Sequence, residues 1–210
     1  MKTKICCVFL VLGILLLMYE WKHDFDTFMS MENVVSDVDG KRYPVVNSFK
    51  GGQEASNMLG QINNFLIGVI RNMKRKYING NQGGSFEREA TLILLDRYNP
   101  DVLFENNPVG TTNTSYVANK GSSIAFCLRE KKSGNNNLHD WPLVQFVALH
   151  EISHIISEEY GHEAGFWNNF KFMENEAVDA GLYDPIDFNN SPQSYCGVNI
   201  EYSPYWSPPM

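Results

Sequence analysis

The feature that most constrains this chain is the stretch from His150 to His154, in which Glu151 directly follows the first histidine. Residues four apart lie on the same face of a helix, so His150 and His154 can direct their imidazoles at one point. Glu151 lies roughly 100° further around the helix, where it can stand beside a metal ion without ligating it. The stretch therefore predicts half of a tetrahedral zinc site with an acid placed to accept a proton from water.

A catalytic zinc site keeps three protein ligands and one open position, so a third ligand must come from elsewhere in the chain. We expect His162 to supply it, because Gly161 ends the helix and lets the chain turn back. The alternative is a glutamate of the following helix, either Glu174 or Glu176. With any of these ligands, the pattern predicts a metallopeptidase that binds Zn²⁺ and hydrolyses peptide bonds of a protein or peptide substrate.

In this interpretation Glu151 is the general base, a role that typically contributes a factor of about 10² to 10⁴ in rate. Candidates for stabilising the oxyanion of the reacting carbonyl are Arg129, Tyr160 and Tyr195, although each also suits a structural role. A second hypothesis is a non-catalytic membrane or virion protein that retains zinc only to hold its fold. Glu151 argues against it, because a purely structural site has no use for an acid beside the metal. Hydrolysis of a bond other than a peptide bond stays open.

The residues around this stretch resemble a known family. Gly161-His162 followed by Phe166-Trp167 is similar to the Gly-His-x-x-x-Phe-Trp continuation of the WLM and SprT-like zincins, which are minimal metallopeptidases. Lys120-Gly121, Cys127-Leu128-Arg129 and Tyr195-Cys196-Gly197 resemble segments of membrane-anchored relatives encoded by large DNA viruses. The resemblance covers roughly residues 115–204. It implies an α+β, zincin-like fold with helices packed on a small antiparallel sheet.

The N-terminal segment, residues 1–21, has a basic start and then an uncharged run from Ile5 to Tyr19. The residues after this run offer no small side chains for signal-peptide cleavage, so we expect an uncleaved signal anchor that crosses a membrane once. Lys2 and Lys4 before the run place the N-terminus in the cytoplasm and the following domain on the other side, in a virion or host membrane.

The rest of the chain divides into a predicted stalk leading into the fold, residues 22–50, and one domain, residues 51–210. Apolar spacing of three and four predicts a long helix over 53–77, followed by helices over 85–97, 141–160 and 163–180. A short strand is expected at 102–104 and a β-hairpin at 115–129, which could hold a peptide along its edge. The tail, residues 182–210, is expected to wrap the surface without regular structure.

The net charge and the cysteine content limit which ligands and crosslinks the chain can have. The net charge of −7 and the pI near 5.2 argue against a nucleic-acid surface, which needs a basic face. Cys127 and Cys196 are the cysteines of the predicted domain, and they can form at most one internal disulfide. Neither belongs to a C-x-x-C pair, so a cysteine-based zinc site is not expected.

Overall fold

The computed structural model describes residues 30–107, 114–130 and 137–206. Its helices are α2 (Gly52–Met73), α3 (Ser85–Arg97), α4 (Trp141–Ile156) and α5 (Ala164–Asp179), with a π-helical turn η1 (Lys74–Asn79) and 3-10 turns η2 (Pro100–Val102) and η3 (Pro204–Trp206). Its strands are β1 (Met31–Val35), β2 (Arg42–Val46), β3 (Leu103–Glu105), β4 (Tyr116–Ala118), β5 (Ser123–Phe126), β6 (Gln193–Tyr195) and β7 (Val198–Ile200). The predicted α+β class is confirmed.

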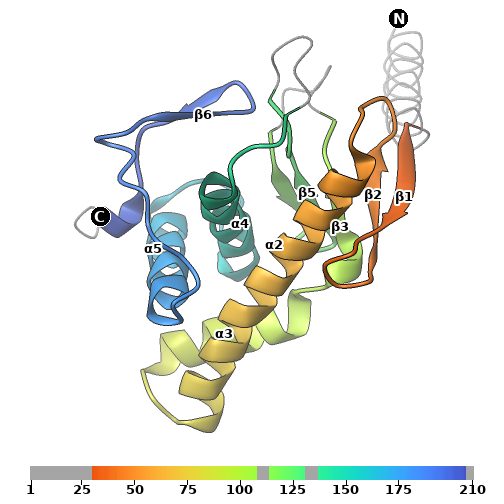
Figure 1. The fold of residues 1–210 in the computed structure, drawn as a ribbon. Coiled ribbons are helices and arrows are strands. Elements are labelled where there is room, and N and C mark those ends of the chain that lie inside the picture. The colour runs from red at the N-terminus through yellow and green to blue at the C-terminus, as the bar shows by residue number, and fades with distance from the viewer. Residues whose placement is uncertain (1–29, 108–113, 131–136, 207–210) are drawn as a thin grey trace, which may run out of the picture.

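The long helix α2 runs across the molecule and contacts elements from both halves of the chain (Figure 1). Its apolar residues recur at three and four, which places them on one face, and that face is buried. It contacts β1 and β2 at one end and packs against α3, α4 and α5 along its length. The predicted helix over 53–77 is confirmed, with its last turn wound as the π-helical turn η1.

Residues 31–46, which lie in the segment predicted as a stalk and entry to the fold, are folded. β1 and β2 form an antiparallel pair in which Met31 faces Val46 and Val35 faces Arg42. Tyr43 and Val45 of β2 are buried in the core that α2 covers. This hairpin was not predicted from the sequence, because β1 is mostly exposed and therefore lacks a clear alternation of apolar and polar residues.

The second sheet has the order β3–β5–β4 and is mixed. β4 and β5 form the predicted antiparallel hairpin, whereas β3 pairs with β5 in parallel. The expectation of a purely antiparallel sheet was therefore wrong, because β5 lies between β3 and β4 and runs parallel to the first and antiparallel to the second. β4 is the outer strand on the side that contacts α4.

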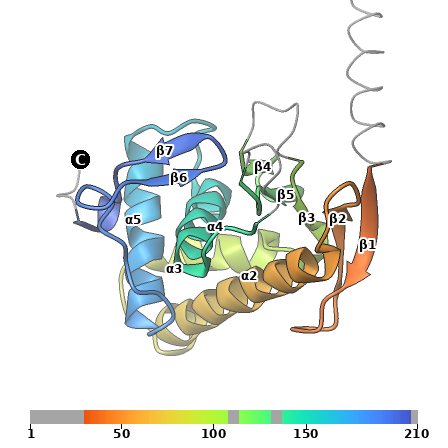
Figure 2. The same ribbon diagram turned by 45° about the horizontal axis from the view of Figure 1, so that its top comes forward.

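The C-terminal tail is more regular than predicted. β6 and β7 form an antiparallel hairpin, and Figure 2 shows it lying over α4 and α5. The two residues between the strands, Cys196 and Gly197, have φ angles of 49° and 85°. Positive φ at both central positions is the geometry of a two-residue type I′ hairpin turn, and cysteine gives little sequence signal for it.

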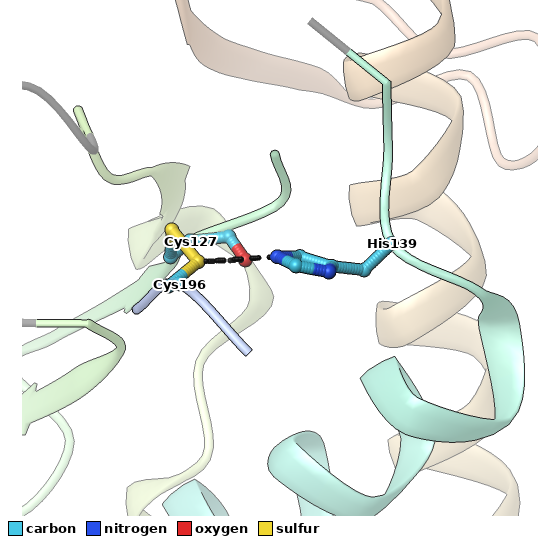
Figure 3. Close-up of side chains that lie close together, drawn as sticks. All are labelled: Cys127, His139 and Cys196. Atoms are coloured by element: carbon cyan, nitrogen blue, oxygen red, sulfur yellow. Dashed lines mark hydrogen bonds between the residues drawn. A yellow bond between two sulfur atoms is a disulfide. The ribbon is translucent and has the colours of Figure 1, made fainter. Parts of the chain in front are cut away.

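A disulfide joins the turn of this hairpin to the end of β5. Cys127 and Cys196 are bonded, with their Cα atoms 6.4 Å apart and a separation of 69 positions in the sequence. In Figure 3 the ring of His139 points toward this bond, and its Nε2 lies 3.3 Å from Sγ of Cys196. The bond closes a long loop that contains all of α4 and α5, so it ties the tail to the sheet.

The predicted membrane anchor, residues 1–21, lies outside the described residues. Among the helices of the described ranges, none combines the length and the apolar character needed to cross a bilayer.

Candidate functional site

The helix α4 carries His150, Glu151 and His154. It begins after Asp140 with Pro142 in its first turn, where a proline removes no helical hydrogen bond. Nearly all of its side chains are buried, and it contacts α2, α3, α5 and β4. Since packing holds the helix on all sides, the directions of the histidine side chains are fixed by the core and not by a mobile loop.

The helix ends at Ile156, five residues before Gly161, so the prediction that Gly161 ends it was wrong. Ser157 adopts an extended backbone, and its hydroxyl donates back to the carbonyl of Ser153 at 2.7 Å. Lys120, in the turn between β4 and β5, donates from Nζ to the carbonyls of Ser157 at 2.5 Å and Glu159 at 2.6 Å. The same Nζ lies 3.5 Å from the carbonyl of His154 in the last turn of α4, so this cation stabilises the helix end and holds the loop that follows it.

This loop returns His162 to the two motif histidines. One potential ligand atom from each of His150, His154 and His162 lies within 4.8 Å of the other two, and Nε2 of His162 is 3.0 Å from Nε2 of His150. Two nitrogens bound to zinc at about 2.0–2.1 Å with a tetrahedral angle lie about 3.3 Å apart. The three imidazoles therefore converge closely enough to share one ion.

Phe166, in the first turn of α5, is fully buried against all three rings. It stacks on His154 with ring centres 4.3 Å apart and meets His150 and His162 edge-on at 4.9 and 4.7 Å. One aromatic ring thus limits the rotation of each histidine. Phe166 was noted only through the family resemblance, and apolar periodicity alone would have placed it in the general core.

The histidines are held in the form that can bind a metal. Burial, followed by the neighbouring rings of His154 and His162, lowers the pKa of His150 to about 3. Burial, then His162 and Lys120, lowers the pKa of His154 to about 4, and burial lowers that of His162. All three are therefore neutral at neutral pH, and a neutral imidazole has a free nitrogen lone pair for a metal ion.

Glu151 is a buried acid without a complete set of partners. Its Oε2 has no hydrogen-bond partner among the described residues. Burial raises the pKa of Glu151 to about 8. A buried carboxylate left unpaired is costly, and a nearby cation or proton donor would relieve that cost. A bound dication and its water would supply the partner that this carboxylate oxygen lacks.

Two pockets adjoin at the histidines, and both are lined by Thr114, His150, Glu151 and His162. The first, about 260 Å³, extends toward β4 and the loop after α4; we call it the polar pocket, and its further lining includes Ser115, Asn119, Lys120 and Glu159. The second, about 320 Å³, extends between α4, α5 and the β6–β7 hairpin; we call it the apolar pocket, and its further lining includes Phe146, Trp167, Phe170, Ile200 and Tyr202. The histidines therefore lie in the middle of a cleft.

The alternative third ligands are engaged elsewhere. Glu174 is buried and accepts hydrogen bonds from Ser203 Oγ at 2.9 Å and the backbone N–H of Tyr205 at 3.0 Å. Glu176 forms an ion pair with Lys76 at 2.8 Å. Both acids hold neighbouring segments to α5. Of the three candidates, His162 is the one that lies beside the two motif histidines.

The oxyanion candidates fall in different places. Arg129 is buried away from the cleft, where it pairs with Glu105 at 2.7 Å and donates to the carbonyl of Lys50 at 2.8 Å. Tyr160 is exposed at the mouth of the polar pocket. The Tyr195 hydroxyl is 2.6 Å from Ser115 Oγ, and its ring lines the apolar pocket. Arg129 is thus a structural residue, while the two tyrosines border the cleft.

Comparison with known proteins finds relatives among viral proteins. It is 34% identical over 170 residues to the uncharacterized protein R325 of Acanthamoeba polyphaga mimivirus, across 80% of this chain and 81% of that protein. This chain belongs to the same family as the mimivirus protein. No family model matches it, and no solved structure gives a significant match.

Two iridovirus proteins share shorter segments with this member of the family. The uncharacterized protein 136R of Invertebrate iridescent virus 6 is 41% identical over 70 residues, which are 33% of this chain and 39% of that protein. The uncharacterized protein 042R of Invertebrate iridescent virus 3 is 30% identical over 91 residues, which are 43% of this chain and 55% of that protein.

Proposed function

We propose that this chain is a zinc-dependent metallopeptidase. The observation that carries the proposal is the convergence of three neutral imidazoles, with ligand atoms within 4.8 Å of one another, beside a buried carboxylate oxygen that has no partner in the described residues. The resemblance to WLM and SprT-like zincins supports the same conclusion.

The residues present fit a zinc ion better than a harder cation. Three imidazole nitrogens suit zinc, whereas Mg²⁺ and Ca²⁺ prefer oxygen ligands. His150, His154 and His162 would hold the ion and leave one coordination position open toward the cleft. When bound, the zinc supplies Lewis-acid polarisation of a carbonyl and lowers the pKa of a water molecule from 15.7 to about 7.

In this mechanism a dication held by the histidines would lower the pKa of Glu151, so that its carboxylate would accept a proton from the attacking water and later deliver it to the leaving amine of the cleaved bond. Burial keeps bulk water away from its carboxyl group, so the proton is not lost to solvent between the two steps. An extended peptide can lie along β4, whose Tyr116 and Val117 line the polar pocket. Substrate backbone and acid would then meet at the histidines.

The proposal includes a membrane tether through residues 1–21, with the domain on the non-cytoplasmic side of a virion or host membrane. The charge pattern of that segment supports the orientation. The Cys127–Cys196 bond is consistent with it, because disulfides persist in oxidising compartments outside the cytosol.

The test uses the full chain purified in a mild detergent and loaded with zinc. Cleavage of a peptide library is compared between the native chain, Glu151→Gln and the matched control Glu158→Gln, an exposed acid just past the end of α4. We expect one zinc per chain in all three and a loss of about 10²- to 10⁴-fold in kcat/KM for Glu151→Gln alone. Stoichiometric zinc without cleavage by any form would instead support a structural zinc protein.

A further inference from the structure

The apolar pocket begins where the proposed chemistry takes place. Its lining includes His150, Glu151 and His162, which also form the inner end of the polar pocket. A peptide whose backbone crosses the histidines would therefore place one side chain at the mouth of the apolar pocket. The adjacent side chains of an extended peptide alternate in direction, so only one of two neighbours would enter it.

The walls of the apolar pocket are already formed. Phe146 and Phe170 belong to the buried core, with ring centres 5.0 Å apart. Trp167 meets Tyr202 edge-on at 5.4 Å, which joins α5 to the segment after β7. The hairpin that completes the wall is tethered by the Cys127–Cys196 bond. A pocket between such fixed elements can select a side chain by shape without reordering.

The chemistry of the lining favours an apolar side chain. Phe146, Trp167, Phe170 and Ile200 present hydrocarbon surface, and the volume of about 320 Å³ accommodates one large side chain. The exposed Glu201 stands at the outer end of the lining, so an acidic side chain would meet a like charge there.

We propose that the apolar pocket binds a large aliphatic or aromatic side chain next to the scissile bond and so determines which peptide bonds are cut. This inference rests on the proposed peptidase function and adds the class of substrate to it. Removing a large apolar side chain from contact with water is expected to give a preference of about 10- to 100-fold in kcat/KM over a small polar side chain at that position.

The first experiment profiles peptide-library cleavage by the full zinc-loaded chain and by Ile200→Asp. Ile200 is partly exposed on β7, so the substitution changes the pocket wall without opening the core. We expect the native chain to cut next to Phe, Leu or Met. The variant should lose at least 10-fold on those peptides and gain cleavage next to Lys or Arg, whose charge the new carboxylate would neutralise.

The matched control is Ser194→Asp, which adds the same charge on an exposed residue of the paired strand outside the pocket lining. It should keep the native preference. Val198→Asp, at the 52% exposed Val198 of the same lining, repeats the test if Ile200→Asp does not fold. Efficient cleavage by the native chain with no preference for large apolar residues would overturn the inference and leave the peptidase function standing.

The second experiment measures binding without cleavage. Calorimetry on the full Glu151→Gln chain compares two hexapeptides that differ only in a central Phe or Asp. We expect at least 10-fold tighter binding of the Phe peptide, lost when Ile200→Asp is added. If the native chain cuts nothing, this binding result alone decides the inference. Tighter binding of the Phe peptide by the Glu151→Gln chain supports the inference, and equal binding of the two peptides rejects it.

Discussion

The described residues contain two clusters of potential metal ligands, and the clusters differ in whether their ligand atoms are free to bind an ion. His150, His154 and His162 converge at a cleft, and Cys127, His139 and Cys196 converge at the turn of the β6–β7 hairpin. In both clusters the ligand atoms lie within 4.8 Å of one another. By distance alone, the two are equivalent.

Their chemistry separates them. The two sulfur atoms of the cysteine cluster are bonded to each other, and its members are all buried (Figure 3). The histidine cluster has no covalent closure, lines two pockets, and has an acid with an unpartnered oxygen beside it. Proximity therefore does not identify a metal site; the ligands must also have free lone pairs and a route for solvent or substrate.

The largest expected effect tests whether the histidine cluster binds zinc, as proposed. His162→Ala removes one of three proposed ligands, and with an apparent zinc-binding free energy of about 10–16 kcal/mol we expect zinc affinity to fall more than 100-fold. His139→Ala is the control, because it removes a histidine from the other cluster. Competition with a chromogenic chelator measures both. Zinc binding that follows His139 and ignores His162 would reverse the assignment.

The second prediction concerns the structural role of the cysteine cluster. Cys196→Ser should lower the free energy of unfolding by about 2–4 kcal/mol, because the bond closes a long loop. Chemical denaturation of the native and variant chains measures the difference. Zinc stoichiometry should stay at one per chain, since the histidine cluster does not include either sulfur. A loss of zinc in this variant would show that the two clusters are not independent.

The third prediction compares two buried acids of the helices α4 and α5. Glu174, unlike Glu151, has hydrogen-bond donors, yet burial raises its pKa from 4.5 to about 7. The folded chain thus keeps this proton to a higher pH than the unfolded chain, so its contribution to stability is present below about pH 4.5 and is lost as pH rises through 7.

Glu174→Gln removes this titration. Between pH 4.5 and 7 the native chain should lose roughly 1–3 kcal/mol relative to the variant, as measured by denaturation at several pH values. Glu158→Gln, at an exposed position, should leave the native slope unchanged. If the free energy of unfolding changed with pH in the same way for the native and Glu174→Gln chains, Glu174 would have the same pKa in the folded and unfolded chain.

The smallest expected effect tests how the cleft holds its third ligand. Lys120→Met removes the cation that donates to the carbonyls of Ser157 and Glu159, so the loop carrying His162 loses its anchor. We expect zinc affinity to fall about 10-fold, with Lys120→Arg restoring part of it. Lys74→Met, an exposed lysine on η1, is the control. Unchanged affinity in Lys120→Met would mean that packing on Phe166 alone fixes His162.

The local elements were predictable where periodicity was strong. The amphipathic pattern of α2 and the turn between β4 and β5 both predicted the observed elements. The β1–β2 and β6–β7 hairpins were missed, because strands of three to five residues with exposed faces carry little alternation. The end of α4 was also missed, since Ser157 and Lys120 end it through contacts that no local pattern encodes.

The sequence by itself determined that His150 and His154 share a helix face with Glu151 beside them, because helical geometry fixes residues four apart. Only the tertiary structure brought His162, rather than Glu174 or Glu176, beside the two motif histidines, because this depends on where the loop after α4 returns and on which donors engage the two glutamates. It likewise decided that Cys127 and Cys196 are bonded and that the tail forms a wall of the cleft. Contacts between residues far apart in the chain depend on how the elements pack, and no short stretch of sequence determines that packing.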